Sequence, residues 1–234
     1  MSDNRDDGEI RKFEALAARW WDPQSEFRPL HEINPLRMGF INSKINPAGQ
    51  RCVDIGWGGG ILSEALAHQG GDVTAIDLAE ASLAVARLHQ LESGLDIRYE
   101  NISAEALAAR EPGQYDIVTC LEMLEHVPDP SSIVEACARL ARPGGHIFFS
   151  TLNRNPKSWL FAVVGAEYVL NLLPRGTHEY ARFIKPSELA QWCRSNHLEQ
   201  GEITGLGYNP LTKKYRLQRD IQVNYLVHYQ KPET

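Results

Sequence analysis

The chain has 234 residues, with 24 Lys+Arg against 30 Asp+Glu, a net charge of −6, and 43% hydrophobic residues. This is the composition of an ordinary globular protein, and a chain of this length can form one α/β domain with extensions. The acidic balance excludes nucleic acid as the main partner, because neutralising its phosphates requires a broad basic surface.

The N-terminal part precedes any regular pattern. Residues 1–9 are polar and are expected to be a disordered tail. Apolar residues at three- and four-residue spacing predict a helix over 10–22. Prolines then predict only short helices and turns up to residue 50, so that residues 10–50 form an N-terminal cap. These prolines are Pro23, Pro29, Pro35 and Pro47.

From residue 51 onward, strand and helix patterns alternate. Strands are predicted over 51–55, 73–76, 97–99, 115–121 and 146–152. Helices are predicted over 61–68, 79–92 and 131–141, with a turn at 143–145. Repeated βαβ units imply a Rossmann-like core over 51–152, with a mostly parallel sheet and helices on both faces.

The remaining residues are expected to complete one domain that extends from residue 10 to residue 234. Residues 153–185 form an insertion around an apolar segment, 159–173. An amphipathic helix over 186–197 and an alternating strand over 221–229 follow it, within a C-terminal part 186–234.

A glycine-rich loop follows the first predicted strand. Its pattern over residues 54–60 is DxGxGxG, with Gly56 and Gly58 at the turn between strand and helix. A cofactor lying across the carboxyl ends of parallel strands needs backbone without Cβ atoms at this place. The dinucleotide fingerprint GxGxxG would require a further glycine at position 61, where the chain has Ile61. This departure disfavours NAD.

Two acidic residues bear on the choice of cofactor, and one of them distinguishes S-adenosylmethionine from NAD. Asp77 ends the next predicted strand, and its carboxylate can accept hydrogen bonds from the ribose diol of NAD or of S-adenosylmethionine. Asp54 favours S-adenosylmethionine, because a carboxylate there attracts a sulfonium and an amino group but would repel a pyrophosphate. Together with the turn at 143–145, this pattern predicts a class I methyltransferase fold.

Further candidate residues follow the fourth predicted strand, at the edge where such folds bind ligands. Leu121 should lie against the cofactor. Glu122, Glu125 and His126 could hold Mg²⁺, or His126 could act as a general base with Glu125 beside it. Alternatively, these polar groups only cap and order the loop.

Several motifs resemble the bacterial ubiquinone biosynthesis O-methyltransferases. They lie at 13–22, 29–37, 122–130, 150–155, 164–168, 176–178, 183–186 and 208–210. The resemblance covers the chain from about residue 10 to about residue 228. It implies two methylations that use S-adenosylmethionine: one on a 2-polyprenyl-6-hydroxyphenol and one on 3-demethylubiquinol.

The resemblance also implies roles for individual residues. The family's cofactor contacts fall on Arg37, Gly56, Asp77 and Leu121. A guanidinium at position 37 suits the cofactor's methionine carboxylate. Eukaryotic relatives are described as using Mg²⁺ at the positions that match Glu122, Glu125 and His126.

One residue departs from the family pattern, which has cysteine where this chain has Trp57. The indole is expected either to turn outward, to solvent or a substrate, or to intrude on the methionine end of the cofactor. We therefore predict weaker cofactor affinity than in Trp57→Cys. The alternatives to the family's activity are another small-molecule methyltransferase and a cofactor-binding module that Trp57 has impaired in catalysis.

The charge is unevenly distributed and bears on location. Residues 1–153 hold 13 basic and 23 acidic side chains, whereas residues 154–234 hold 11 and 7. The apolar segment 159–173, about 22 Å long as a helix, is too short to cross about 30 Å of hydrocarbon. It is expected to lie in the interface of an anionic membrane or to be a buried lid helix.

The cysteines indicate a reducing compartment. They form no CxxC pair and no zinc spacing, so they are expected to be small buried hydrophobes. They are Cys52, Cys120, Cys137 and Cys193. With no apolar segment at the N-terminus, a cytoplasmic protein is expected, peripheral on the inner face of the membrane, with other enzymes of the ubiquinone pathway as further partners.

Overall fold

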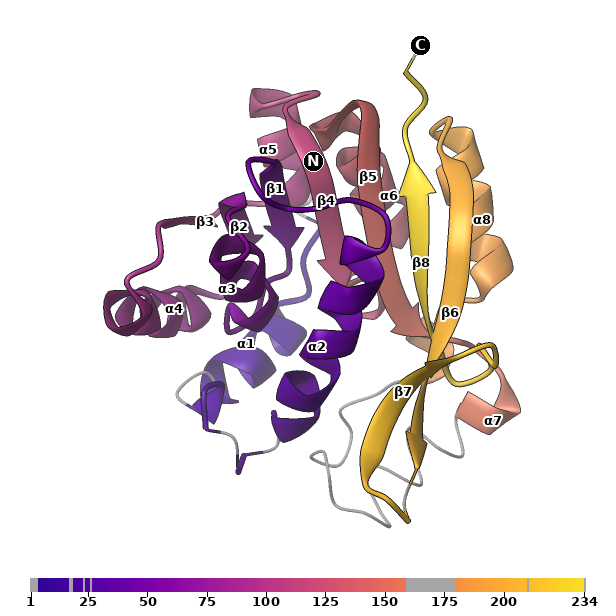
Figure 1. Cartoon of the computed structure of the whole chain (residues 1–234). Helices are drawn as coiled ribbons and strands as arrows, with labels where there is room; N and C mark the ends of the chain where they lie inside the picture. The colour runs from indigo at the N-terminus through magenta and orange to yellow at the C-terminus, as the bar shows by residue number, and fades with distance from the viewer. Residues whose placement is uncertain are drawn as a thin grey trace.

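The structure, a computed structural model, describes residues 4–16, 19–22, 24–25, 27–158, 180–209 and 211–233. An eight-stranded sheet crosses the molecule in the order β3-β2-β1-β4-β5-β8-β6-β7 (Figure 1). The strands are β1 (Arg51–Ile55), β2 (Asp72–Asp77), β3 (Ile97–Asn101), β4 (Tyr115–Leu121), β5 (Ala141–Leu152), β6 (Glu199–Asn209), β7 (Lys214–Gln218) and β8 (Asn224–Gln230). Strands β1 to β5 are parallel, and the other three pair antiparallel.

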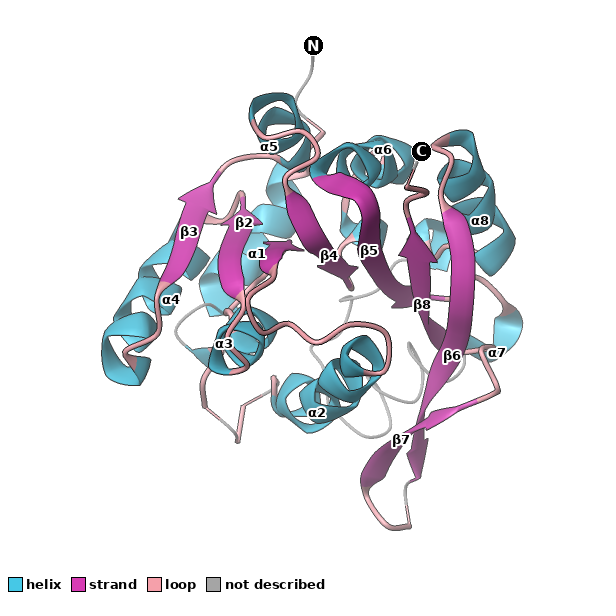
Figure 2. Ribbon diagram, turned by 45° about the horizontal axis from the view of Figure 1, so that its top comes forward, coloured by secondary structure: helices cyan, strands magenta, loops and turns pink. Residues whose placement is uncertain are grey.

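Helices cover both faces of this sheet, with α2, α3 and α4 on one face and α5, α6 and α8 on the other (Figure 2). The α-helices are α1 (Asp7–Leu16), α2 (Arg28–Asn42), α3 (Ile61–His68), α4 (Glu80–Ser93), α5 (Ala104–Arg110), α6 (Pro130–Leu140), α7 (Pro156–Ser158) and α8 (Pro186–Ser195). Short 3-10 helices span Leu124–His126 and Tyr180–Arg182. The predicted Rossmann-like fold is therefore confirmed.

Successive side chains of each central strand point to opposite faces of the sheet and so contribute to two separate apolar cores. In β1, Cys52 belongs to the same apolar cluster as Leu66 of α3, whereas Val53 belongs to the other cluster, with Leu107 of α5. Strands buried on both faces read as continuous apolar runs, which is why the sequence pattern located them well. All four cysteines are buried with free thiols, as predicted.

The N-terminal cap is more regular than its prolines indicated. Helix α2 is 15 residues long and contains Pro35, with Pro29 in its first turn. Its buried side chains include Ile33 and Phe40, so tertiary packing outweighs the backbone hydrogen bond that Pro35 cannot donate. The prediction of only short helices and turns up to residue 50 was wrong.

Other boundaries also differ from the predictions. Helix α1 begins at Asp7 and ends at Leu16, so the expected disordered tail 1–9 is wrong for residues 7–9, and the helix does not continue to residue 22. The predicted turn at 143–145 lies inside β5. Helix α5 and the β6–β7 hairpin were not predicted. The apolar segment 159–173 lies outside the described residues.

The parallel strands bring their carboxyl ends to one edge of the sheet, where the glycine loop after β1, Asp77 of β2 and Leu121 of β4 meet. The N-terminal half of α2 and the β6–β7 hairpin lie on the same side of the molecule (Figure 1). In the part of the chain that the structure describes, no helix has the length and apolar character needed to span a membrane.

Candidate functional site

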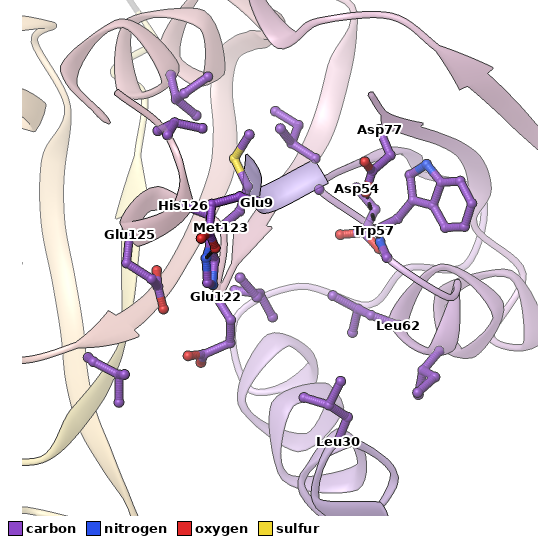
Figure 3. A pocket seen from close by; sticks show the side chains of 18 of the residues that line it. Glu9, Leu30, Asp54, Trp57, Leu62, Asp77, Glu122, Met123, Glu125 and His126 are labelled. Carbon is purple, nitrogen blue, oxygen red and sulfur yellow. Dashed lines mark hydrogen bonds and ion pairs between the residues drawn. The ribbon is translucent and has the colours of Figure 1, made fainter. Parts of the chain in front are cut away.

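A cavity of about 660 Å³ lies at this edge of the sheet. Every residue that the sequence singled out for cofactor binding or catalysis lines it. These residues are Arg37, Asp54, Gly56, Gly58, Asp77, Leu121, Glu122, Glu125 and His126. Figure 3 shows five of them: Asp54, Asp77, Glu122, Glu125 and His126. The fold thus gathers into one site residues that are far apart in the sequence.

The glycine loop needs its glycines for conformation and for space. Gly56 has a φ of 71°, and a Cβ there would lie 2.5 Å from Cγ of Met123. Gly58 has a φ of 58°, and a Cβ there would lie 2.8 Å from the Trp20 ring. Only glycine accommodates both constraints. The loop can therefore run directly along the cavity wall.

Asp77 is held in place by the same loop. Its Oδ2 accepts a hydrogen bond from the Gly58 N–H at 3.1 Å, and its Oδ1 accepts one from the Ala79 N–H at 2.9 Å. Burial raises the pKa of Asp77, although these backbone donors oppose the rise. Each carboxylate oxygen can accept a further hydrogen bond, so the side chain suits a ribose diol in the cavity.

Asp54 connects three elements behind the loop. Its Oδ2 accepts a hydrogen bond from Ser63 Oγ of α3, and its Oδ1 accepts one from Thr119 Oγ1 of β4, both at 2.7 Å. The pKa of Asp54 is raised overall, because the effect of burial outweighs its hydrogen bonds and the charge of Arg37, which lower it. A cation in the cavity would likewise favour the ionised carboxylate.

Arg37 reaches the cavity from α2 and is 6% exposed. Its Nη2 donates to Glu122 Oε1 at 3.2 Å, and the same oxygen accepts a hydrogen bond from Ser150 Oγ at 2.6 Å. Among the described residues, the buried Nε of Arg37 has no hydrogen-bond partner. A buried donor of this kind favours an anionic group in the cavity.

Glu125 is buried beside β5. Its Oε2 accepts a hydrogen bond from Thr151 Oγ1 at 2.8 Å. Burial, reinforced by the charge of Glu122, raises the pKa of Glu125 to about 7. A carboxyl group with such a pKa can take up or release a proton near neutral pH.

His126 is paired with a residue from the N-terminal helix. Its Nδ1 lies 2.8 Å from Oε2 of Glu9, and Figure 3 shows the two side chains together on the cavity wall. Burial lowers the pKa of His126, but the hydrogen bond to Glu9 and the charges of Glu125, Glu9 and Glu122 outweigh it, so the pKa is raised overall.

The side chains proposed as magnesium ligands do not converge. Glu122 bonds to Arg37 and Ser150, Glu125 bonds to Thr151, and His126 bonds to Glu9. Across the described residues, no group of three His, Cys, Asp or Glu side chains is arranged to hold a metal ion. The metal prediction is therefore unsupported, because each ligand is committed to a different partner.

Trp57 lies in the wall on the Asp77 side of the cavity, across from His126 and Glu125 (Figure 3). Its indole packs against the Tyr99 ring at a centroid distance of 4.8 Å and is 6% exposed. The expectation that it turns outward to solvent is wrong, because the apolar cluster around Leu62 and Tyr99 accommodates the indole. Its effect on cofactor affinity stays a prediction.

The sequence does not indicate every residue of the site. Glu9 lies in the expected tail 1–9, and Ser150 stands only within the motif at 150–155. Tyr208 and Tyr215 of the β6–β7 hairpin line the cavity, although the hairpin itself was not predicted. No local pattern assigns these residues to the cavity, because each of them reaches its place through contacts between segments distant in sequence.

Comparisons with known proteins identify the family of the chain. The family model of the methyltransferase domain matches residues 53–149. A ubiquinone biosynthesis O-methyltransferase of Stutzerimonas stutzeri is 63% identical over 224 residues, covering 96% of this chain and 97% of the relative. The protein of that name from Pseudomonas aeruginosa strain UCBPP-PA14 is 61% identical over 228 residues, covering 97% and 98%.

Solved structures support the fold. Magnesium protoporphyrin IX methyltransferase of Synechocystis PCC 6803, with bound S-adenosylhomocysteine, matches with a TM-score of 0.69 at 17% identity, covering 97% of each chain. The same enzyme with S-adenosylmethionine matches with a TM-score of 0.67 at 17% identity, covering 99% of this chain and all 100% of the other. With its methyltransferase fold, its cavity and these near full-length relatives, the chain belongs to the family of ubiquinone biosynthesis O-methyltransferases, which depend on S-adenosylmethionine.

Proposed function

We propose that this O-methyltransferase methylates hydroxyl groups of polyprenyl-substituted aromatic rings, a 2-polyprenyl-6-hydroxyphenol and 3-demethylubiquinol. The observation that carries the proposal is that one cavity is lined both by the glycine loop with Asp77 and by the Glu9–His126 pair, which lie on different sides of it (Figure 3). The relatives' names supply the pathway. The cavity supplies a place where cofactor and phenol can meet.

The residues present fit S-adenosylmethionine. Asp77 suits its ribose diol, and the unpartnered Nε of Arg37 suits its carboxylate. Asp54 and Glu122 also line the cavity, and their negative charge would favour a cationic sulfonium there. When bound, the cofactor supplies a methyl group carried by that sulfonium.

His126 is proposed to prepare the acceptor. A phenol has a pKa of about 10, so its oxygen is a weak nucleophile until it loses its proton. His126 takes this proton, the phenolic oxygen forms a bond to the methyl carbon, and the bond between sulfur and that carbon breaks. The products are the methyl ether and S-adenosylhomocysteine. Buried Glu125, whose pKa is raised to about 7 chiefly by burial, is proposed as the next acceptor of this proton.

Another part of the cavity lining suits an apolar substituent. It includes Leu152, Leu206 and Val223, together with Tyr208 and Tyr215 from the hairpin. Apolar and aromatic side chains bury the first isoprene units of a tail while the ring stays beside His126. Because the metal ligands do not converge, no step is assigned to Mg²⁺.

A methyl-transfer assay with a short-chain demethylubiquinol tests this function. We expect transfer of label from S-adenosylmethionine to the quinol and to a prenylated hydroxyphenol, with turnover falling about 100-fold or more in His126→Ala while cofactor affinity stays within twofold. Absence of transfer to both substrates would contradict the proposed substrate class. Unchanged turnover in His126→Ala would contradict the role of His126 only.

We also propose peripheral binding to an anionic membrane surface, where a polyprenyl substrate would reside. Exposed Leu211, with Lys213 and Lys214 after it, forms the tip of the β6–β7 hairpin and supports this location. Cosedimentation with phosphatidylglycerol vesicles should exceed that with phosphatidylcholine vesicles and should weaken in the double variant Lys213→Glu, Lys214→Glu. Equal binding to both vesicle types would contradict an electrostatic contribution. Association with other pathway enzymes stays a prediction.

A further inference from the structure

Glu9 is an acidic residue in the first turn of α1, and it is buried although it lies close to the N-terminus. Its Oε2 lies 2.8 Å from Nδ1 of His126, a residue 117 positions further along the chain. Burying a carboxylate is costly unless it is paired. The imidazole is such a partner, and both side chains line the same cavity.

The backbone around Glu9 is anchored at several points. The Asn4 side chain accepts a hydrogen bond from the Asp129 N–H and donates to the Asp129 carbonyl, both at 2.8 Å. The Asp6 carboxylate accepts from the Glu9 N–H at 3.2 Å, and its other oxygen pairs with Arg182 at 2.8 Å. These contacts hold the start of α1 against the cavity and fix the direction from which Glu9 approaches His126.

The neighbouring carboxylates have other hydrogen-bond donors. Glu125 accepts from Thr151, and Glu122 accepts from Ser150 and Arg37. These two carboxylates act on the imidazole of His126 through their charges. The carboxylate that accepts a hydrogen bond from its Nδ1 is that of Glu9. The roles of the three acids are therefore separable by mutation.

We infer that Glu9 is the positioning residue for His126: its carboxylate accepts a hydrogen bond from Nδ1–H and thereby fixes both the rotation of the ring and the tautomer with the lone pair on Nε2. This inference rests on the proposed role of His126 as the base. A neutral imidazole protonated on Nδ1 presents Nε2 as its proton acceptor. Carboxylates that orient a histidine in this way contribute to turnover without touching the substrate.

The test compares Glu9→Ala, Glu9→Gln and the control Asp7→Asn in the full chain. Asp7 lies in the same first turn, has a 64% exposed side chain and pairs with Arg5 at the surface. Glu9→Gln retains an oxygen that can accept from Nδ1–H but loses the charge. The readouts are kcat and KM for a short-chain demethylubiquinol, the Kd for S-adenosylhomocysteine and the thermal midpoint.

We expect Glu9→Ala to lower kcat about 30- to 100-fold, because positioning provides a part of what general base catalysis contributes. KM and Kd should stay within about twofold of the wild-type values. Glu9→Gln should recover part of the lost kcat, and Asp7→Asn should match the wild type. In the His126→Ala background, Glu9→Ala should have almost no further effect on kcat, because the group that it positions is gone.

A spectroscopic measurement separates positioning from folding. In ¹⁵N-histidine-labelled protein at alkaline pH, the His126 signals should indicate a proton on Nδ1 in the wild type and an average of both tautomers in Glu9→Ala. Unchanged tautomer signals and kcat in Glu9→Ala would overturn the inference, as would an equal loss of kcat when Glu9→Ala is added to His126→Ala. If His126→Ala retains full turnover, the proposed base itself fails, a different result from the failure of Glu9 alone.

Discussion

Arg37 of α2 and Glu122 after β4 meet across the cavity, with Nη2 of the arginine 3.2 Å from Oε1 of the glutamate. Glu122 has a φ of 54°, and its N–H donates to the Ser150 carbonyl at 3.0 Å. This contact joins the N-terminal cap to the loop that carries His126. Arg37 also lines the cavity, where its buried Nε has no hydrogen-bond partner among the described residues. A mutation of Arg37 should therefore affect cofactor binding more than the stability of the core.

For Arg37→Ala we predict a loss of cofactor affinity of about 10- to 100-fold, the range expected for a charge-assisted hydrogen bond of about 1.5–3 kcal/mol. Titration calorimetry with S-adenosylmethionine and S-adenosylhomocysteine measures it. Arg28→Ala is the matched control, because Arg28 begins the same helix and pairs with Glu32 at the surface. Equal affinities for Arg37→Ala and Arg28→Ala would contradict a direct role of Arg37 in binding.

The sheet and the glycine loop were predictable because their signals are local. Apolar runs over 51–55 and 115–121 match β1 and β4 at both ends. The cap was not predictable in the same way, since Pro35 lowers the helix propensity of a segment that is stabilised by burial against the sheet. The β6–β7 hairpin was missed because glycines interrupt its alternation, among them Gly205, which lies against Asp220.

The residues of the site likewise divide into those that a local pattern predicts and those that only the fold brings together. Asp54 and Asp77 have roles that follow from strand ends and a glycine pattern, which a single sequence displays. Ser150 and Glu9 act through partners 28 and 117 residues away, and only the fold brings them there. The prediction of three metal ligands is unsupported for a related reason. Sequence spacing places residues near one another but does not determine the direction in which each side chain points.

Trp57→Cys should affect stability as well as binding. The indole is buried in a cluster with Tyr99 and Leu62, so its removal leaves a cavity and should lower the free energy of unfolding by about 2–4 kcal/mol. Tighter cofactor binding in Trp57→Cys is the sequence prediction that remains to be tested. Urea unfolding and titration calorimetry measure the two effects separately, and equal affinity in both proteins would contradict the binding prediction.

The pH dependence of stability should show a contribution from His228. This residue of β8 hydrogen-bonds to His146 of β5 at 2.9 Å, and burial, followed by the charges of His146 and Lys44, lowers its pKa to about 4. Because the unfolded state binds the proton more tightly, with a pKa of about 6.5, stability is present above that pH and is lost as the pH falls toward 4.

Between pH 7 and pH 5, His228 should therefore account for about 1–2 kcal/mol of lost unfolding free energy. In His228→Gln, the curve of unfolding free energy against pH should be shallower by this amount. His68→Gln is the control, since His68 is exposed at the end of α3. Parallel curves for the wild type and His228→Gln would contradict this assignment.

The glycine loop allows a test that separates backbone strain from crowding. Gly56 and Gly94 have φ values of 71° and 67°, so alanine is strained at both positions. A Cβ at Gly56 would collide with Met123, whereas a Cβ at Gly94 meets nothing within 4 Å. Strain alone costs about 1–2 kcal/mol, which is the destabilisation expected for Gly94→Ala.

Gly56→Ala should be destabilised further and should also lose cofactor affinity, because Met123 and the loop must move along the cavity wall to admit the methyl group. Gly94→Ala should bind S-adenosylhomocysteine like the wild type, since Gly94 ends α4 and does not line the cavity. Thermal unfolding and titration calorimetry on both variants check this. Equal destabilisation together with unchanged affinity in both would mean that the close approach of Gly56 to Met123 has no part in shaping the cofactor site.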